Sequence, residues 1–170
     1  MKKREINSIE LYPQLSKEGI EKSTIKKGIP LIIVSTLYHK EITGSMVTSF
    51  LESANFDNDS DTYAIVEVPG AFELPLIIKI ILEKYIPKQV LALGCIIKGE
   101  TNHDEYLAST VINGLRNLSL EYKTPVINGV LTTNTLQQAI DRAGKKYNKG
   151  KDFADTYNKM SVLLDKIKNE

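Results

Sequence analysis

Short apolar runs rich in β-branched residues alternate along the chain with longer segments in which apolar residues recur every three or four positions. The short runs have the length of strands covered on both faces, and they lie at residues 29–36, 62–68, 89–97 and 125–133. The longer segments predict helices at residues 41–56, 72–85, 104–123, 135–147 and 151–169. In the third of these helices, the spacing predicts a core-facing stripe of Tyr106, Leu107, Val111, Leu115 and Leu118.

Strand and helix alternate four times, which predicts an α/β fold. Crossovers between parallel strands are right-handed, and strands buried on both faces need helices on both sides. The expected architecture is therefore a three-layer sandwich with a four-stranded parallel sheet in flavodoxin-like order, spanning residues 30–170. Residues 1–29 are polar and lysine-rich, and we expect an N-terminal arm that lies on another surface rather than folding alone.

The amino-acid composition limits which partners the protein is expected to bind and in which compartment it is expected to work. Lysine plus arginine total 22 against 21 acids, so the net charge of +1 provides no basic field for a nucleic acid. The single cysteine, Cys95, lies inside an apolar run, where it is expected to pack as a small hydrophobic residue. No disulfide within the chain is possible and neither a signal peptide nor a membrane-length apolar segment is evident, so a cytoplasmic protein is expected.

In open parallel sheets, ligands bind beyond the carboxyl ends of the strands. The loop after the third strand reads "KGETNHDE", and the amides of Glu100, Thr101 and Asn102 would face outward at a helix start that favours an anion. His103 at the helix entry could exchange a proton near neutral pH. On this loop alone, a plain capped helix start with a solvated histidine explains the residues equally well.

The other loops carry weaker signals, each with a purely structural interpretation beside the functional one. Tyr38 could stack on a flat ring or simply pack as an aromatic. Glu73 could accept hydrogen bonds from ligand hydroxyls, or belong to a capped helix start with Phe72 in the core. Arg142 is either a solvated charge or a phosphate clamp.

Several enzyme classes are excluded by missing motifs. The chain has no Walker loop, GxGxxG, nucleophile elbow or CxxC. Its two histidines, His39 and His103, do not form a spaced ligand pattern, so no metal site is expected.

Taken together, "VPGAFELP", "ALGCIIKGETNHDEY" and "GVLTTNTLQQAIDRAG" resemble the 6,7-dimethyl-8-ribityllumazine synthase family over residues 30–165. The resemblance implies that 5-amino-6-(D-ribitylamino)uracil condenses with 3,4-dihydroxy-2-butanone 4-phosphate, without cofactor or metal, in the penultimate step of riboflavin biosynthesis. A catalytically weak lumazine- or flavin-binding homologue, and a shell protein whose role is assembly, are the rival interpretations.

The resemblance also implies the residues of the site. Those expected around ribitylaminouracil are Tyr38, Ala71, Phe72, Glu73, Cys95, Ile96, Ile97 and Asn128. Those expected around the butanone phosphate are Glu100 and Thr101, with Arg142 as the counter-charge and His103 as the proton carrier. Asn128 stands where the family usually has a phenylalanine near the pyrimidine.

Assembly is the last property that the resemblance implies. Members of the family form homo-pentamers or 60-subunit icosahedral shells, with active sites between subunits. The N-terminal arm would then add a strand to a neighbouring sheet. Arg142 and Asn128 would come from one subunit and His103 from the next. The implied partners are the two small-molecule substrates, further copies of the chain and riboflavin synthase, and neither nucleic acid nor a membrane.

Overall fold

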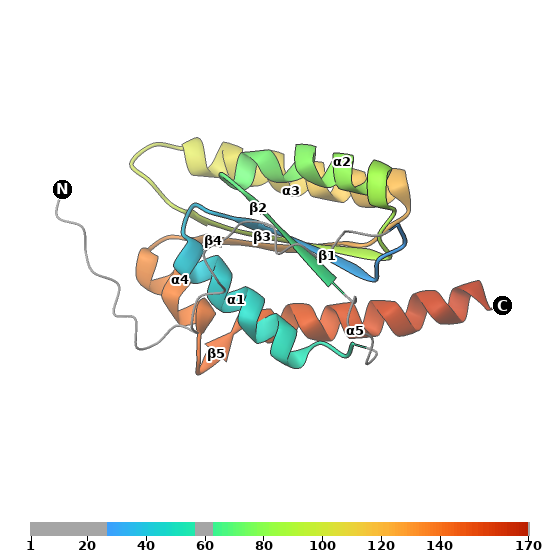
Figure 1. The fold of residues 1–170 in the computed structure, drawn as a ribbon. Coiled ribbons are helices and arrows are strands. Elements are labelled where there is room, and N and C mark those ends of the chain that lie inside the picture. Colours follow the sequence, from blue (N-terminus) through green and yellow to red (C-terminus); the bar gives the residue numbers. More distant parts are fainter. Residues whose placement is uncertain (1–26, 57–62, 170) are drawn as a thin grey trace.

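The computed structural model describes residues 27–56 and 63–169, which form the expected α/β sandwich of three layers (Figure 1). The strands are β1 (Leu31–Thr36), β2 (Tyr63–Val68), β3 (Gln89–Ile97) and β4 (Val126–Thr133). They pair in parallel in the order β2-β1-β3-β4, as in flavodoxin-like sheets, so the predicted fold class is confirmed. The predicted arm lies outside the described residues except for residues 27–29.

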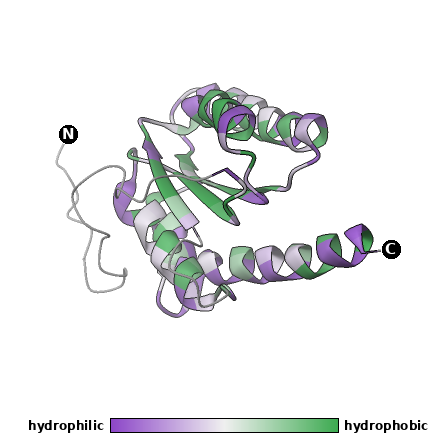
Figure 2. Ribbon diagram, turned by 45° about the vertical axis from the view of Figure 1, so that its right-hand side comes forward, coloured by the Kyte–Doolittle hydropathy of each residue, from purple (hydrophilic) through white to green (hydrophobic). Residues whose placement is uncertain are grey.

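Helices cover both faces of the sheet. One face carries the short helix η1 (Ala71–Glu73), α2 (Leu74–Tyr85) and α3 (His103–Tyr122), and the other carries α1 (Lys40–Ser53), α4 (Leu136–Ala143) and α5 (Lys149–Lys168). Hydrophobic colour is concentrated on the strands and on the helix faces that meet them (Figure 2). Strand β1 is buried throughout, which explains its unbroken apolar sequence. Within residues 27–56 and 63–169, none of the helices combines the length and the hydrophobicity of a membrane span.

Two details of the helix predictions are wrong. Tyr106 was expected to face the core, but its side chain is 72% exposed, whereas Val111, Leu115 and Leu118 are buried as expected. The helix predicted for residues 135–147 ends at Ala143, and a tight hairpin follows that includes β5 (Tyr147–Asn148).

The buried side chain of Asn148 explains this hairpin. Its Nδ2 donates to the carbonyl oxygen of Ala143 at 2.6 Å, which ties the hairpin to the end of α4. Its Oδ1 accepts from the amide of Gly150 at 2.8 Å, which caps the start of α5. One amide side chain therefore ends one helix and begins the next.

Helix α5 packs very closely on α1 where it begins. A Cβ added to Gly150 would lie 2.9 Å from the amide nitrogen of Phe50 and nearer still to the carbonyl oxygen of Met46. Both of these atoms belong to the backbone of α1, which cannot move aside as a side chain could. Gly150 thus sets the distance between the two helices.

Strand β4 is one edge of the sheet, and side chains cover part of its outer side. The amide of Val126 donates to Oγ of Ser119 at 3.3 Å, and the amide of Val130 donates to Oδ1 of Asn128 at 3.1 Å. Because the carbonyls of Pro125 and Thr133 accept bonds from β3, the even-numbered residues between them face outward. Two outward amides of this edge are therefore already bonded.

Candidate functional site

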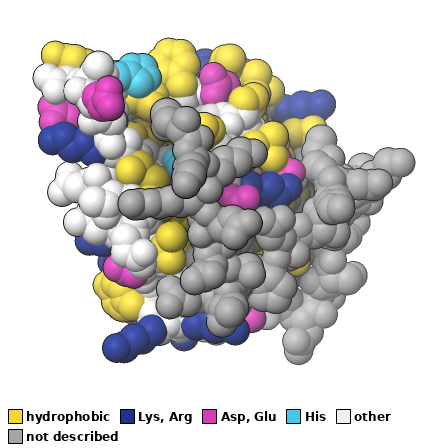
Figure 3. Space-filling model, turned by 90° about the vertical axis from the view of Figure 1, so that its left-hand side faces the viewer, with side chains coloured by type: hydrophobic (Ala, Val, Ile, Leu, Met, Phe, Trp, Pro, Cys, Tyr) yellow, Lys and Arg dark blue, Asp and Glu magenta, His cyan; other side chains and the backbone are white. Residues whose placement is uncertain are grey.

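The carboxyl ends of the strands open onto the end of the molecule that faces the viewer in Figure 3, where hydrophobic, charged and histidine side chains gather. Tyr38 follows β1, Phe72 and Glu73 follow β2, and His103 follows β3. The topology thus brings to one edge four residues that the sequence singled out. The site prediction depended on this clustering.

The loop from β3 to α3 leaves three consecutive amides without an acceptor in the described part of the chain. The amide of Lys98 donates to the carbonyl oxygen of Thr133 at 2.8 Å, and that of Gly99 donates to Oδ1 of Asp104 at 3.2 Å. The amides of residues 100–102 have no such partner. Together with the N-terminus of a 20-residue helix, they form a cradle suited to a phosphate group.

His103 is the first residue of α3, and its side chain is exposed at the edge of this cradle. Its own amide approaches Oγ1 of Thr101 at 3.4 Å. Asn102 occupies the N-cap position, but its side chain makes no capping hydrogen bond. The interpretation of this loop as an ordinary capped helix start therefore lacks its main interaction, and the helix end stays open to a ligand.

Tyr38 borders the same edge with most of its side chain in solvent, at 68% exposure. Its backbone is fixed because its amide donates to the carbonyl oxygen of Pro69 at 3.1 Å. The ring of His39 meets it edge-on, with centroids 4.4 Å apart. Burial lowers the pKa of His39, an effect that the nearby Glu41 carboxylate partly offsets. Tyr38 thus presents an open ring face on a fixed backbone, as a stacking platform requires.

The segment after β2 gives a second exposed aromatic. Ala71, Phe72 and Glu73 form the short helix η1, and Phe72 is 66% exposed. The interpretation that placed Phe72 in the core is therefore wrong. The carboxylate of Glu73 lies close to Gly70, where an added Cβ would come within 3.2 Å of its Oε2. The turn thus keeps a carboxylate acceptor and an apolar ring beside each other at the edge.

The end of β3 extends beyond the strand β1 that pairs with it. Pairing with β1 ends at Leu93, whereas pairing with β4 continues to Ile97. The amides of Val90 and Lys98 donate toward β4, so the odd-numbered Cys95 and Ile97 face the β1 side. Their backbone can therefore meet a ligand beyond the last pair with β1.

The side chains at this strand end are mostly out of reach of such a ligand. Cys95 and Ile96 are buried, and Ile97 is half-buried. Burial raises the pKa of the Cys95 thiol to about 12, so this cysteine packs as expected and is no nucleophile. Any contribution of residues 95 and 96 to a site would come from the backbone.

Arg142 lies in a separate hollow of about 550 Å³ beyond the ends of β3 and β4. It shares this hollow with Lys98, Asp104 and Glu105, and its Nη1 donates to the carbonyl oxygen of Gln138 at 3.0 Å. Tyr38, Phe72, Glu73 and His103 do not line it. Arg142, the expected counter-charge of the phosphate, therefore does not share a hollow with His103, the expected proton carrier of the same chain.

Asn128 lies away from the carboxyl edge of the sheet. It pairs with Ala92 in the middle of β4, five residues before Thr133, which places it roughly 16 Å from the carboxyl edge. Its side chain is exposed on the outer edge of the sheet. Asn128 can thus serve the site only if a neighbouring molecule brings its own carboxyl edge against β4.

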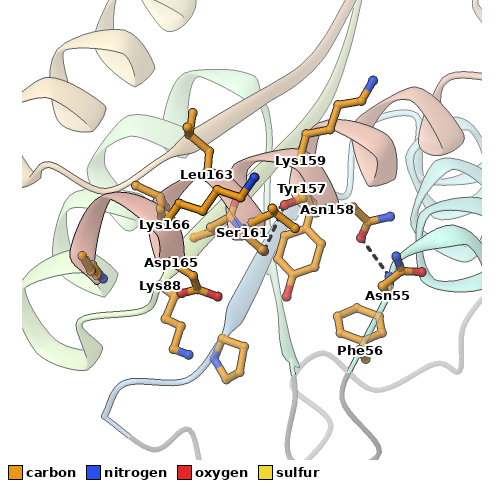
Figure 4. Close-up of a pocket in the computed structure, with 15 residues that line it drawn as sticks. Asn55, Phe56, Lys88, Tyr157, Asn158, Lys159, Ser161, Leu163, Asp165 and Lys166 are labelled. Atoms are coloured by element: carbon orange, nitrogen blue, oxygen red, sulfur yellow. Dashed lines mark hydrogen bonds between the residues drawn. The ribbon is translucent and has the colours of Figure 1, made fainter. Parts of the chain in front are cut away.

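A second hollow, of about 570 Å³, opens at the opposite end of the sheet (Figure 4). Phe56 and Tyr157 face each other there with ring centroids 5.8 Å apart, and Asn55 bonds to Asn158 at 2.8 Å. None of the residues singled out by the sequence lines it. Within the described residues, no group of histidine, cysteine and acidic side chains could hold a metal ion.

Comparison with known proteins identifies the family that this chain resembles over most of its length. Residues 28–165 match the family model for 6,7-dimethyl-8-ribityllumazine synthase. A 6,7-dimethyl-8-ribityllumazine synthase from Thermus thermophilus is 38% identical over 143 residues, which cover 83% of this chain and 91% of that relative. The matched span includes every residue predicted for the site.

Proposed function

Because the chain belongs to the 6,7-dimethyl-8-ribityllumazine synthase family, and is thus a transferase of riboflavin biosynthesis, we propose that it condenses 5-amino-6-(D-ribitylamino)uracil with 3,4-dihydroxy-2-butanone 4-phosphate. The products are 6,7-dimethyl-8-ribityllumazine, phosphate and water. The same proposal places the enzyme in the cytoplasm, in keeping with its single, buried thiol. The observation that carries the proposal is the open cradle of amides 100–102 beside His103.

The pyrimidine and its ribityl chain would lie along the exposed end of the sheet. Tyr38 would stack on the ring, and the backbone of Cys95 and Ile97 would meet the polar edge of the uracil. The stretch of residues 71–73 would hold the ribityl chain, with Glu73 accepting from its hydroxyls. This arrangement is supported by the open ring face of Tyr38 and by the extension of β3 past β1.

The butanone phosphate would bind with its phosphate on the amide cradle. The pyrimidine amine then attacks the ketone, water is lost to form a Schiff base, and phosphate leaves as an enol develops. Ring closure on the second carbonyl completes the lumazine. Holding the two reactants in register supplies most of the acceleration, and proton transfer by His103 adds about 100-fold to 10,000-fold.

The active site would be completed by a neighbouring subunit of a pentamer or of a 60-subunit shell. Two observations support this arrangement. First, Arg142 and His103 do not line the same hollow, and Asn128 lies roughly 16 Å from the carboxyl edge. Apolar side chains are also exposed on α2 and at the carboxyl edge, namely those of Leu37, Tyr38, Phe72, Leu76, Ile80 and Tyr106.

Turnover is tested by mixing the purified chain with both substrates and following the absorbance of the lumazine product. We expect product formation without added metal or cofactor. Uptake of the lumazine by the protein, with no new product from the two substrates, would identify a binding homologue instead. Light scattering on the same sample gives the size of the assembly, and a monomer would contradict the shared site.

The shared site is tested by co-expressing His103→Ala and Arg142→Ala chains with different tags. If each site takes His103 from one subunit and Arg142 from the next, random assembly leaves about a quarter of the sites with both residues intact. We therefore expect the mixed assemblies to exceed the activity of either variant alone. Mixed assemblies no more active than the two separate variants would show that both residues act within one chain.

A further inference from the structure

The amide cradle already contains an anion of its own, the carboxylate of Asp104. Its Oδ1 accepts the amide of Gly99 at 3.2 Å, which is the amide directly before the three free ones. Asp104 also lines the hollow that contains Lys98 and Arg142. The carboxylate thus lies between the loop that would bind phosphate and the cationic side of α4.

We propose that Asp104 is a positioning residue that holds the β3–α3 loop with its amides open and, by its own charge, weakens the binding of a phosphate group there. This inference rests on the proposed function, because it takes residues 100 and 101 as the phosphate site. It assigns a role to a side chain that was not among the residues predicted for the site.

The positioning part follows from the hydrogen-bond pattern. The loop is anchored at Lys98 by the bond to Thr133, and at Gly99 by the bond to Asp104. Without the carboxylate, Gly99 has no acceptor in the described chain and can rotate freely, as glycine does. The orientation of the next three amides would then be less fixed, and binding would cost more conformational entropy.

The electrostatic effect of Asp104 follows from the short distance between its carboxylate and the bound phosphate. Successive Cα atoms are about 3.8 Å apart, so a phosphate on the amides of residues 100 and 101 lies within about 6–8 Å of the Asp104 carboxylate. Like charges at that separation in an exposed loop weaken affinity about 3-fold to 10-fold. The Asp104 carboxylate would therefore hold the loop in shape and at the same time repel the phosphate that binds there.

Three variants separate the two effects. Asp104→Asn keeps an oxygen that can accept from Gly99 and removes the charge, whereas Asp104→Ala removes both. Glu105→Gln is the matched control, because it removes a neighbouring charge of the same hollow that makes no bond to the loop. The readouts are the KM for each substrate, kcat, and the affinity of the purified protein for inorganic phosphate.

We expect Asp104→Asn to lower the KM for the butanone phosphate and the Kd for inorganic phosphate about 3-fold to 10-fold. The KM for the pyrimidine should change less than about twofold, since its contacts lie elsewhere. Asp104→Ala should bind phosphate more weakly than Asp104→Asn does, while Glu105→Gln reports the gain from charge removal alone. Asp104 is half-buried and Glu105 is exposed, so none of the three substitutions disturbs the core and near-ultraviolet circular dichroism should stay unchanged.

Either of two results would overturn the inference. If Asp104→Asn binds inorganic phosphate no more tightly than the unaltered chain, the charge does not oppose the ligand. If Asp104→Ala and Asp104→Asn bind it equally, the loop is not positioned by this bond. Failure of the proposed function is separate and distinguishable, because it appears as missing lumazine with the unaltered chain, whatever these variants do.

Discussion

Replacing Gly150 by alanine should destabilise the protein, although alanine is the better helix former. The new Cβ would lie 2.9 Å from the amide nitrogen of Phe50, inside the 3.4 Å at which ordinary contact begins, and nearer still to the backbone of Met46. Helices α1 and α5 would have to move apart. Such overpacking costs about 1–3 kcal/mol, and the helix propensity of alanine offsets at most about 1 kcal/mol of it.

Because the clash is with backbone atoms, the upper part of that cost, about 2–3 kcal/mol, applies. The net loss of about 1–2 kcal/mol corresponds to a fall in Tm of about 2–8 °C for a chain of this size. Thermal unfolding followed by circular dichroism at a fixed protein concentration measures it, since assembly makes Tm depend on concentration. The matched control is Gly44→Ala on α1, where an added Cβ meets nothing within 4 Å. This control should gain about 0.5–1 kcal/mol. A Tm for Gly150→Ala at or above that of the unaltered chain would refute the packing argument.

Three further predictions concern the site. His103→Ala should reduce kcat about 100-fold to 10,000-fold while leaving the affinity for the lumazine unchanged; complete loss of turnover in a folded, ligand-binding variant would show that alignment contributes less than argued. Asn128→Phe should lower the KM for the pyrimidine about 2-fold to 10-fold through stacking, and an unchanged or higher KM would argue against contact with this position. Because burial raises the pKa of the Cys95 thiol from 9.0 to about 12, the native state keeps a proton that the unfolded chain releases above pH 9. The contribution of the buried, protonated thiol to the free energy of unfolding is therefore complete below pH 9 and declines as the pH rises toward 12. In a thiol-reagent assay at pH 8, native Cys95 should stay unmodified and the unfolded chain should react, and rapid labelling of the native protein would contradict this.

The alternation of apolar runs was sufficient to predict the sheet and its helices. Strands buried on both faces leave an unbroken hydrophobic signal, as β1 does. The hairpin after Ala143 was not predicted, because Lys145, Lys146 and Tyr147 fit a continued helix and the deciding contact comes from Asn148. Gly144, the residue at which α4 ends, was the one stop signal in the sequence. Tyr106 shows the limit of periodicity, since its helical phase fits the core but the first turn of α3 lies beyond the end of the sheet.

The gathering of the candidate residues at one edge was predictable, because parallel strands place their following loops on the same side of the sheet. Tyr38, Phe72 and His103 meet this expectation. Spacing could not reveal that Asp104 bonds to the amide of Gly99, because that contact depends on how the loop folds back on itself. Spacing alone also could not place Arg142 in a hollow that His103 does not line, and only the family resemblance implied that these two residues come from different subunits.

The two bonded amides on the outer side of β4 make this edge of the sheet different from the opposite edge, which β2 forms. A strand that approaches β4 must first break the bonds from Val126 and Val130, each worth about 1 kcal/mol, before any new ladder can form. No side chain bonds to a backbone amide of β2 in the described chain, so that border accepts an added strand at no such cost. Among the described residues, the border formed by β2 is therefore the one at which a further strand can pair with the smaller loss of existing bonds.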